Sequence, residues 1–123
     1  MSFLDELEVI SEETLDFVED SLFPRRNLGT RHCEWIGIND KLCLSIQASA
    51  MHYCIPRELV PLDEYTHFEL AIIYNAELSN RKSIFKEFNR YEELIECWES
   101  GVFACVEKEL LEDLYKYCKE KLK

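Results

Sequence analysis

Apolar residues recur at intervals of three and four along the first part of the chain, and acidic residues fill the positions between them. The apolar positions are Phe3, Leu7, Ile10, Phe17, Val18 and Leu22. This spacing forms one stripe on an α-helix, so the pattern predicts a helix over residues 2–22 that ends at Pro24. Ser11, which precedes Glu12 and Glu13, is a second start signal, so one long helix and two short ones both fit the pattern.

The middle of the chain changes to alternation, which is typical of strands with one face on a core. Residues 33–38 and 41–48 predict a hairpin joined at Asn39 and Asp40, because these two residue types tolerate the positive φ of a two-residue turn. Residues 67–74 predict a further strand. The positions expected on the apolar faces are Leu42, Leu44, Ile46 and Ala48 in one strand, and Phe68, Leu70, Ile72 and Tyr74 in the other.

The C-terminal part returns to helical spacing. After a polar loop at 75–83, residues 91–99 predict a short helix, 102–106 a short strand and 107–122 a closing helix. The chain therefore has an expected α+β fold, with a mostly antiparallel sheet of about four strands and with N-terminal and C-terminal helices packed on it. The length of 123 residues fits a single domain over 1–123.

Charge is sorted along the chain, whose net charge is −11. Residues 1–22 hold eight acids and no Lys or Arg, whereas 23–57 hold five basic residues and two acids, together with His32 and His52. Arg25 and Arg26 are explained most simply as compensation for the acidic segment before them. A cationic region on an acidic protein predicts a small anionic ligand, and the surrounding acids exclude direct binding of bulk nucleic acid.

The beginning of the chain is acidic and lacks the basic start and apolar run of a secretory signal, and no apolar stretch approaches the length of a membrane span. We therefore expect a soluble cytoplasmic protein without membrane association. In that compartment the six cysteines should be reduced thiols. Their spacing matches no metal signature, so we expect neither a metal nor another cofactor.

The strongest local feature is the segment 47–57, which gathers an amide, a hydroxyl, an imidazole, a phenol, a thiol and a guanidinium after a strand. Arginine binds a phosphate with two parallel hydrogen bonds, and tyrosine stacks on a base. In this interpretation Arg57 contacts phosphate, His52 forms a hydrogen bond, and Tyr53 or Tyr65 stacks. The ligand-binding set is completed by side chains that bond polar edges, namely Gln47, Ser49 and Glu69.

Three alternatives to this interpretation remain open. The segment 47–57 also fits a structural loop, with Tyr53 in the core and Arg57 paired with an acid such as Glu58 or Glu69. A Cys54–His52 hydrolase is the weaker alternative, because the sequence offers no further support for it. We therefore assign no catalytic residues and expect a protein that is not an enzyme. The acidic helix faces fit solvated surface, or a DNA mimic that inhibits a partner protein.

Three stretches in the middle of the chain resemble small uncharacterised proteins of phages and other bacterial mobile elements. They are Ser-Ile-Gln-Ala-Ser at 45–49, His-Tyr-Cys-Ile-Pro-Arg-Glu at 52–58 and Asp-Glu-Tyr-Thr-His-Phe-Glu-Leu-Ala-Ile at 63–72. The resemblance implies a counter-defence role in the host cytoplasm and carries no established activity. The leading expectation is a phage-type binding protein for a nucleotide-like signal, and the alternative is an anti-CRISPR-like inhibitor of a host defence protein. A homodimer is also expected, because a shared interface would deepen a shallow site.

Overall fold

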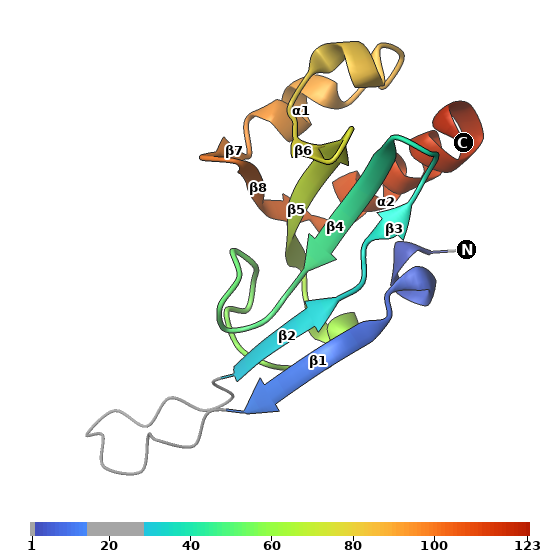
Figure 1. Ribbon diagram of the computed structural model, residues 1–123. Helices are drawn as coiled ribbons and strands as arrows, with labels where there is room; N and C mark the ends of the chain where they lie inside the picture. The colour runs from blue at the N-terminus through green and yellow to red at the C-terminus, as the bar shows by residue number, and fades with distance from the viewer. Residues whose placement is uncertain (1, 15–28) are drawn as a thin grey trace.

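The computed structural model describes residues 2–14 and 29–123, and its main feature is a six-stranded antiparallel sheet (Figure 1). The strands follow the order β3-β4-β5-β8-β7, and β6 pairs with β5. Their bounds are β3 Ile36–Gly37, β4 Leu42–Gln47, β5 His67–Tyr74, β6 Glu77–Leu78, β7 Trp98–Glu99 and β8 Val102–Glu107. The expected α+β class with mostly antiparallel pairing is confirmed, but the expected number of strands is too small.

A separate two-stranded sheet pairs β1 (Val9–Thr14) with β2 (Gly29–Cys33) in antiparallel register. The prediction of a helix over residues 2–22 is therefore wrong for residues 2–14. Only a turn of 3₁₀ helix, η1 (Phe3–Glu6), forms there, and residues 15–22 lie outside the described part. The segment 9–14 contains Val, Ile and Thr, whose branched Cβ atoms favour strands, and pairing with β2 decides the outcome.

The predicted turn at Asn39 is confirmed, but Asn39 and Asp40 do not adopt the expected positive φ, and β4 begins only at Leu42. The Asn39 Oδ1 accepts hydrogen bonds from the N–H groups of Lys41 and Leu42, at 2.8 and 2.9 Å. The strand predicted before it, 33–38, is broken into two pieces. Cys33 ends β2, and Ile36–Gly37 alone pairs with β4, so the chain passes from one sheet to the other between them.

The core lies on the face of β4 and β5 that alternation predicted. Leu44 and Ile46 pair with Ile72 and Leu70 across the two strands, and all four side chains are fully buried. The helix α2 (Lys108–Tyr117) continues into η4 (Cys118–Leu122) and crosses behind these strands in Figure 1. The buried side chains of this C-terminal segment are Leu110, Leu111, Leu114, Tyr115 and Cys118.

The described residues also form shorter helical elements. They are η2 (Leu62–Glu64), η3 (Lys82–Phe85) and α1 (Tyr91–Ile95). The helix predicted over 91–99 ends early, because Trp98 and Glu99 form β7 and pair with β8. Within residues 2–14 and 29–123, the structure has no helix long and apolar enough to cross a membrane.

Candidate functional site

The loop between β4 and β5 carries most of the predicted ligand-binding residues, and backbone hydrogen bonds tie it to three strands. The Ala50 N–H donates to the carbonyl of Gly29 in β2 at 3.0 Å. The Ile55 N–H donates to the carbonyl of His67 in β5 at 3.1 Å. The Cys105 N–H, in β8, donates to the carbonyl of Tyr53 at 3.0 Å. These bonds hold the first half of the loop, from residue 50 to residue 55, against the strands.

The bond from Cys105 depends on an irregularity in β8. Cys105 has a φ of 49°, and the pairing of β5 with β8 shifts register between Phe68 and Leu70. A bulge of this kind turns a backbone N–H out of the strand ladder. Here that N–H reaches the carbonyl of Tyr53 in the loop.

Gln47 and Ser49 are buried and bonded within the protein. The Gln47 Oε1 accepts from the N–H of Cys33, and its Nε2 donates to the carbonyl of Cys33, both at 2.8 Å. This amide joins β4 to β2. Ser49 Oγ lies 2.6 Å from His52 Nδ1 and accepts a hydrogen bond from the N–H of Met51 at 3.2 Å. Gln47 therefore links the two sheets where the loop begins, and Ser49 fixes the conformation of the loop between residues 49 and 52.

Tyr65 is 2% exposed, so its ring does not reach the surface. Its hydroxyl donates to the carbonyl of Glu58 and accepts from the N–H of Val60 at 3.1 Å. Burial raises the pKa of the Tyr65 hydroxyl, although the hydrogen bond with Val60 opposes this change. Of the two stacking candidates, Tyr53 is the one with exposed ring surface, because it is 45% exposed.

His52 is 8% exposed, and its ring lies edge-on to that of His32, with 5.6 Å between the centroids. Burial lowers the pKa of the His52 imidazole below its ordinary value of 6.5. The charge of Glu69 opposes this lowering of the pKa, whereas His32, Arg31 and Arg57 add to it. The imidazole is therefore neutral at pH 7 and acts as a hydrogen-bonding partner of Ser49.

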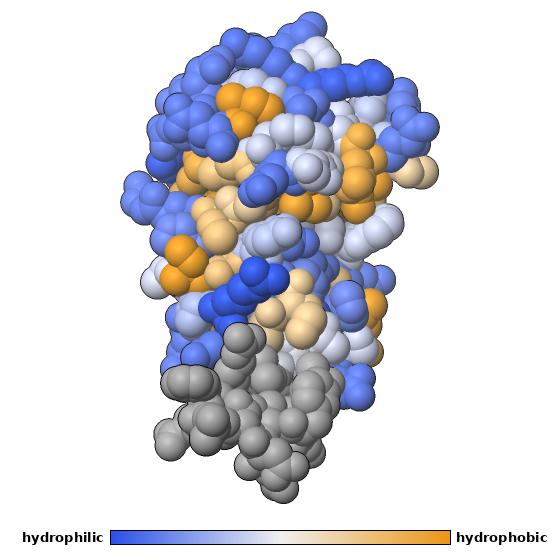
Figure 2. Space-filling view, turned by 90° about the vertical axis from the view of Figure 1, so that its left-hand side faces the viewer, coloured by the Kyte–Doolittle hydropathy of each residue, from blue (hydrophilic) through white to orange (hydrophobic). Residues whose placement is uncertain are grey.

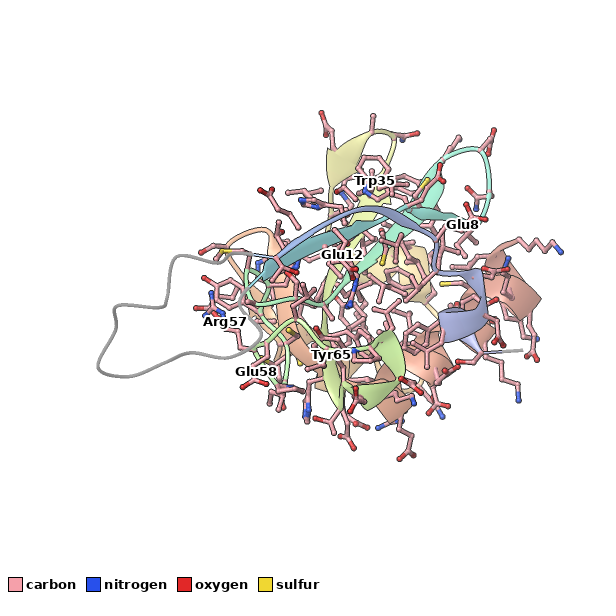
Figure 3. All side chains as sticks on the ribbon, turned by 90° about the horizontal axis from the view of Figure 1, so that it is seen from below. Glu8, Glu12, Trp35, Arg57, Glu58 and Tyr65 are labelled. Carbon is pink, nitrogen blue, oxygen red and sulfur yellow. The ribbon has the colours of Figure 1, made fainter. Side chains whose placement is uncertain are left out.

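Arg57 and Tyr53 form the exposed part of the predicted site. The Arg57 guanidinium carbon lies 5.1 Å from the centroid of the Tyr53 ring, and Nε donates to the carbonyl of Ala50 at 3.3 Å. Glu69 does not pair with this arginine; its Oε2 accepts from the N–H of Tyr53 at 2.9 Å. Among the described residues no ion pair reaches the terminal nitrogens of Arg57. Figure 3 shows Arg57 at the periphery of the molecule and Tyr65 inside it.

Arg31 belongs to the cationic segment of the sequence, but in the structure its side chain is buried and bonded within the protein. It is 5% exposed, and its Nε contacts Glu12 Oε1 at 2.9 Å. Its two terminal nitrogens donate to the carbonyls of Ala48, at 3.2 Å, and Val60, at 2.7 Å. The sequence carried no signal for this role, because it depends on the pairing of β1 with β2.

Cys54 does not have the surroundings of a catalytic nucleophile. Its thiol donates to the carbonyls of Ser49, at 3.2 Å, and Pro56, at 3.3 Å. Burial raises the pKa of the Cys54 thiol, which favours the unreactive protonated form. Across the described part of the chain, no three His, Cys, Asp or Glu side chains converge as a metal ion would require.

The face that carries the loop and β7 is mixed in character. Figure 2 shows separate apolar patches among hydrophilic surface there.

The protein was compared with known families, curated proteins and solved structures, and none of them matches this chain.

Proposed function

We propose that the chain is a binding protein, not an enzyme, and that Arg57 and Tyr53 contact a small nucleotide-like anion on the surface of the 48–57 loop. The observation that carries the proposal is the position of the Arg57 guanidinium over the Tyr53 ring, with Nε already bonded to Ala50. An arginine held in this way loses less side-chain entropy when it binds than a free surface arginine does. Its terminal nitrogens form the planar fork that fits a phosphate.

The other predicted residues stabilise the loop that carries Arg57 and Tyr53. Gln47 bonds the backbone of Cys33, Tyr65 bonds that of Glu58, and Ser49 bonds the N–H of Met51 within the loop. Glu69 accepts a hydrogen bond from the N–H of Tyr53. In this proposal they fix the loop instead of touching the ligand. The exposed part of the Tyr53 ring offers a stacking surface for a base, which is tolerant of base identity.

The acidic balance of the chain favours a small ligand over a polymer. A net charge of −11 repels a long phosphate backbone, whereas one or two phosphates interact mainly with the nearest cation. A phage-type protein that sequesters a nucleotide signal of host defence is consistent with these properties. That biological role rests on the resemblance of residues 45–72 to mobile-element proteins and belongs to the proposal.

The proposal is tested by titrating the protein with a panel of mononucleotides, cyclic dinucleotides and inorganic phosphate in a calorimeter. Removal of Arg57 in Arg57→Ala should weaken binding by about 30- to 1,000-fold, which corresponds to the loss of roughly 2–4 kcal/mol from a charge-assisted contact. Arg57→Lys should recover only part of the affinity, because an ammonium lacks the fork.

Arg81→Ala is the matched control, because Arg81 is an exposed arginine whose side chain makes no ion pair among the described residues. Its affinity for the same nucleotide should equal that of the unmodified protein. If Arg57→Ala keeps full affinity and native thermal stability, or if no member of the panel binds, the proposal fails.

A further inference from the structure

One edge of β1 is unpaired among residues 2–14 and 29–123. In the described part of the chain, β1 has β2 on one side and no strand on the other. Figure 1 shows β1 as the outermost strand at the lower right of the ribbon, with β2 between it and β4. All six of its residues, Val9–Thr14, are exposed. A strand edge of this length is a template on which another extended chain can pair.

The hydrogen bonds of β2 show which way its backbone groups point. The N–H and C=O of Cys33 both bond to the Gln47 side chain, and the C=O of Gly29 accepts from Ala50. Gly29 and Cys33 therefore direct these groups away from β1. In an antiparallel pair, residues whose backbone N–H and C=O groups point away from the partner strand alternate with residues whose groups bond to it. Arg31, midway between them, follows the same pattern.

The β1 residues paired with Gly29 and Arg31 must direct their own backbone N–H and C=O groups away from β2, toward the outer edge of β1. Arg31 is opposite Glu12, and Gly29 is opposite Thr14. The backbone N–H and C=O groups of Glu12 and Thr14 thus point outward, where a further strand would bond to them. Figure 3 shows Glu12 midway along this strand.

The side chains along this edge define the chemistry of an occupant. Val9 is 48% exposed and Ile10 is 65% exposed, so an added strand would cover apolar surface. Glu8 and Glu13 are exposed carboxylates without an ion pair among the described residues. A strand that pairs here would lie beside a row of negative charge.

A second copy of β1 does not fit this edge well. Two β1 strands side by side would bring Glu12 and Glu13 of both copies close together, and like charges across a pair destabilise it. Charged side chains are a common means by which proteins keep edge strands from pairing with their own copies. The same charges attract a strand that carries Lys or Arg.

We propose that the β1 edge binds an extended, basic segment of a partner protein, which adds to the sheet as a third strand. Lys or Arg residues at alternate positions of that segment share one face, where they pair with Glu13. The segment forms backbone hydrogen bonds with Glu12 and Thr14. This surface is distinct from the 48–57 loop, so the inference does not depend on the proposed nucleotide site.

A shallow hollow beside the start of β1 extends the surface. Its lining includes Trp35, which is 56% exposed, and the carboxylates of Asp5, Glu8 and Glu34. The one lysine in the lining, Lys119, is already paired with Glu6 at 3.0 Å. An exposed indole flanked by carboxylates is suited to the end of a lysine or arginine side chain, through cation–π and ionic contacts.

The test uses a synthetic peptide in which Lys alternates with Val, and a control peptide in which Glu alternates with Val. The binding of each is followed by calorimetry and by backbone amide exchange. The Lys peptide should bind and should protect the amides of Glu12 and Thr14 from exchange, and the Glu peptide should do neither. Glu12→Pro and Glu12→Ala both remove the carboxylate, but only the proline also removes the outward N–H. An edge strand accepts proline at such a position.

Glu12→Pro should bind the Lys peptide about tenfold more weakly than Glu12→Ala, as the loss of one hydrogen bond predicts. Glu13→Lys should weaken binding, whereas Glu87→Lys, a reversal at another exposed acid, should weaken it much less. Equal affinity of the two Glu12 variants, equal binding of the Glu peptide, or unprotected amides in the unmodified protein would overturn the proposal. So would light scattering that shows a dimer which Glu12→Pro dissociates, because a second copy would then occupy the edge.

Discussion

The side-chain amide of Gln47 forms two hydrogen bonds with the backbone of Cys33, one with the N–H and one with the C=O, each at 2.8 Å. A single side chain in β4 thus takes the place of the backbone hydrogen bonds that a neighbouring strand would form with Cys33 in β2. The two sheets of the protein are joined at this point. The loop that carries Arg57 begins directly after Gln47, so the junction also positions the candidate site.

Replacing Gln47 by Leu should lower the free energy of unfolding by about 2–4 kcal/mol, because the buried N–H and C=O of Cys33 lose their partner. Urea denaturation followed by circular dichroism measures this change. Ser45→Ala is the control, since Ser45 Oγ accepts only a secondary bond from Gln47 at 3.1 Å. It should cost less than about 1.5 kcal/mol. Equal effects of the two substitutions would contradict the joining role of Gln47.

Replacing Arg31 by Lys should destabilise the protein by about 2–4 kcal/mol, since a lysine cannot reach Glu12, Ala48 and Val60 at once. Glu12→Ala should cost less than about 1 kcal/mol, because the Glu12 side chain is 49% exposed and its ion pair is screened by water. Thermal and urea unfolding of both variants test this order. A larger effect of Glu12→Ala than of Arg31→Lys would show that the ion pair, and not the carbonyl contacts, holds the arginine.

The stability of the protein should depend on the protonation of His52. Burial lowers the pKa of the folded imidazole below the value of 6.5 expected for the unfolded chain. Between these two pKa values the unfolded chain binds more protons, so the free energy of unfolding falls as pH drops below 6.5. The contribution is fully present above that pH. It is lost by the time pH reaches the folded pKa.

Denaturant titrations across this range should therefore show a weaker pH dependence for His52→Asn than for the unmodified protein. Because the substitution removes only this one titratable group, the difference between the two curves isolates the imidazole. Superimposable curves, apart from a constant offset, would mean that His52 titrates alike in the folded and unfolded states.

All six cysteines are free thiols in the structure, and they differ in accessibility. Denatured, unreduced protein should yield six equivalents of thiol. In the folded protein, burial raises the pKa of the Cys118 thiol to about 12, so this residue should react with iodoacetamide among the slowest. Buried Cys33 should also react slowly, and half-exposed Cys43 sooner. Mass spectrometry of timed digests gives the order, and early labelling of Cys118 would be inconsistent with its place in the core.

The core faces of β4, β5 and α2 could be read from the sequence, because each of these segments places one periodic apolar face on a common core. The alternation of Leu42, Leu44 and Ile46 is confirmed by their burial, and the Asn39 turn by its side-chain hydrogen bonds. For the candidate site, the sequence indicated the loop and the residues Tyr53 and Arg57 within it, whereas the contact between these two side chains is seen only in the structure. These features depend on residues close together in the chain.

The N-terminal strand and the role of the buried polar residues were decided by tertiary structure alone. Ile10 belongs to the predicted helical stripe, yet it is exposed in a strand, as Val9 is, because β1 takes its hydrogen bonds from β2. Arg31 reads as a surface cation until Glu12, Ala48 and Val60 surround it. Local periodicity determines a segment's structure where an apolar face meets the core. Where a polar segment is held by partners distant in the chain, only the folded arrangement supplies the hydrogen bonds that select its conformation.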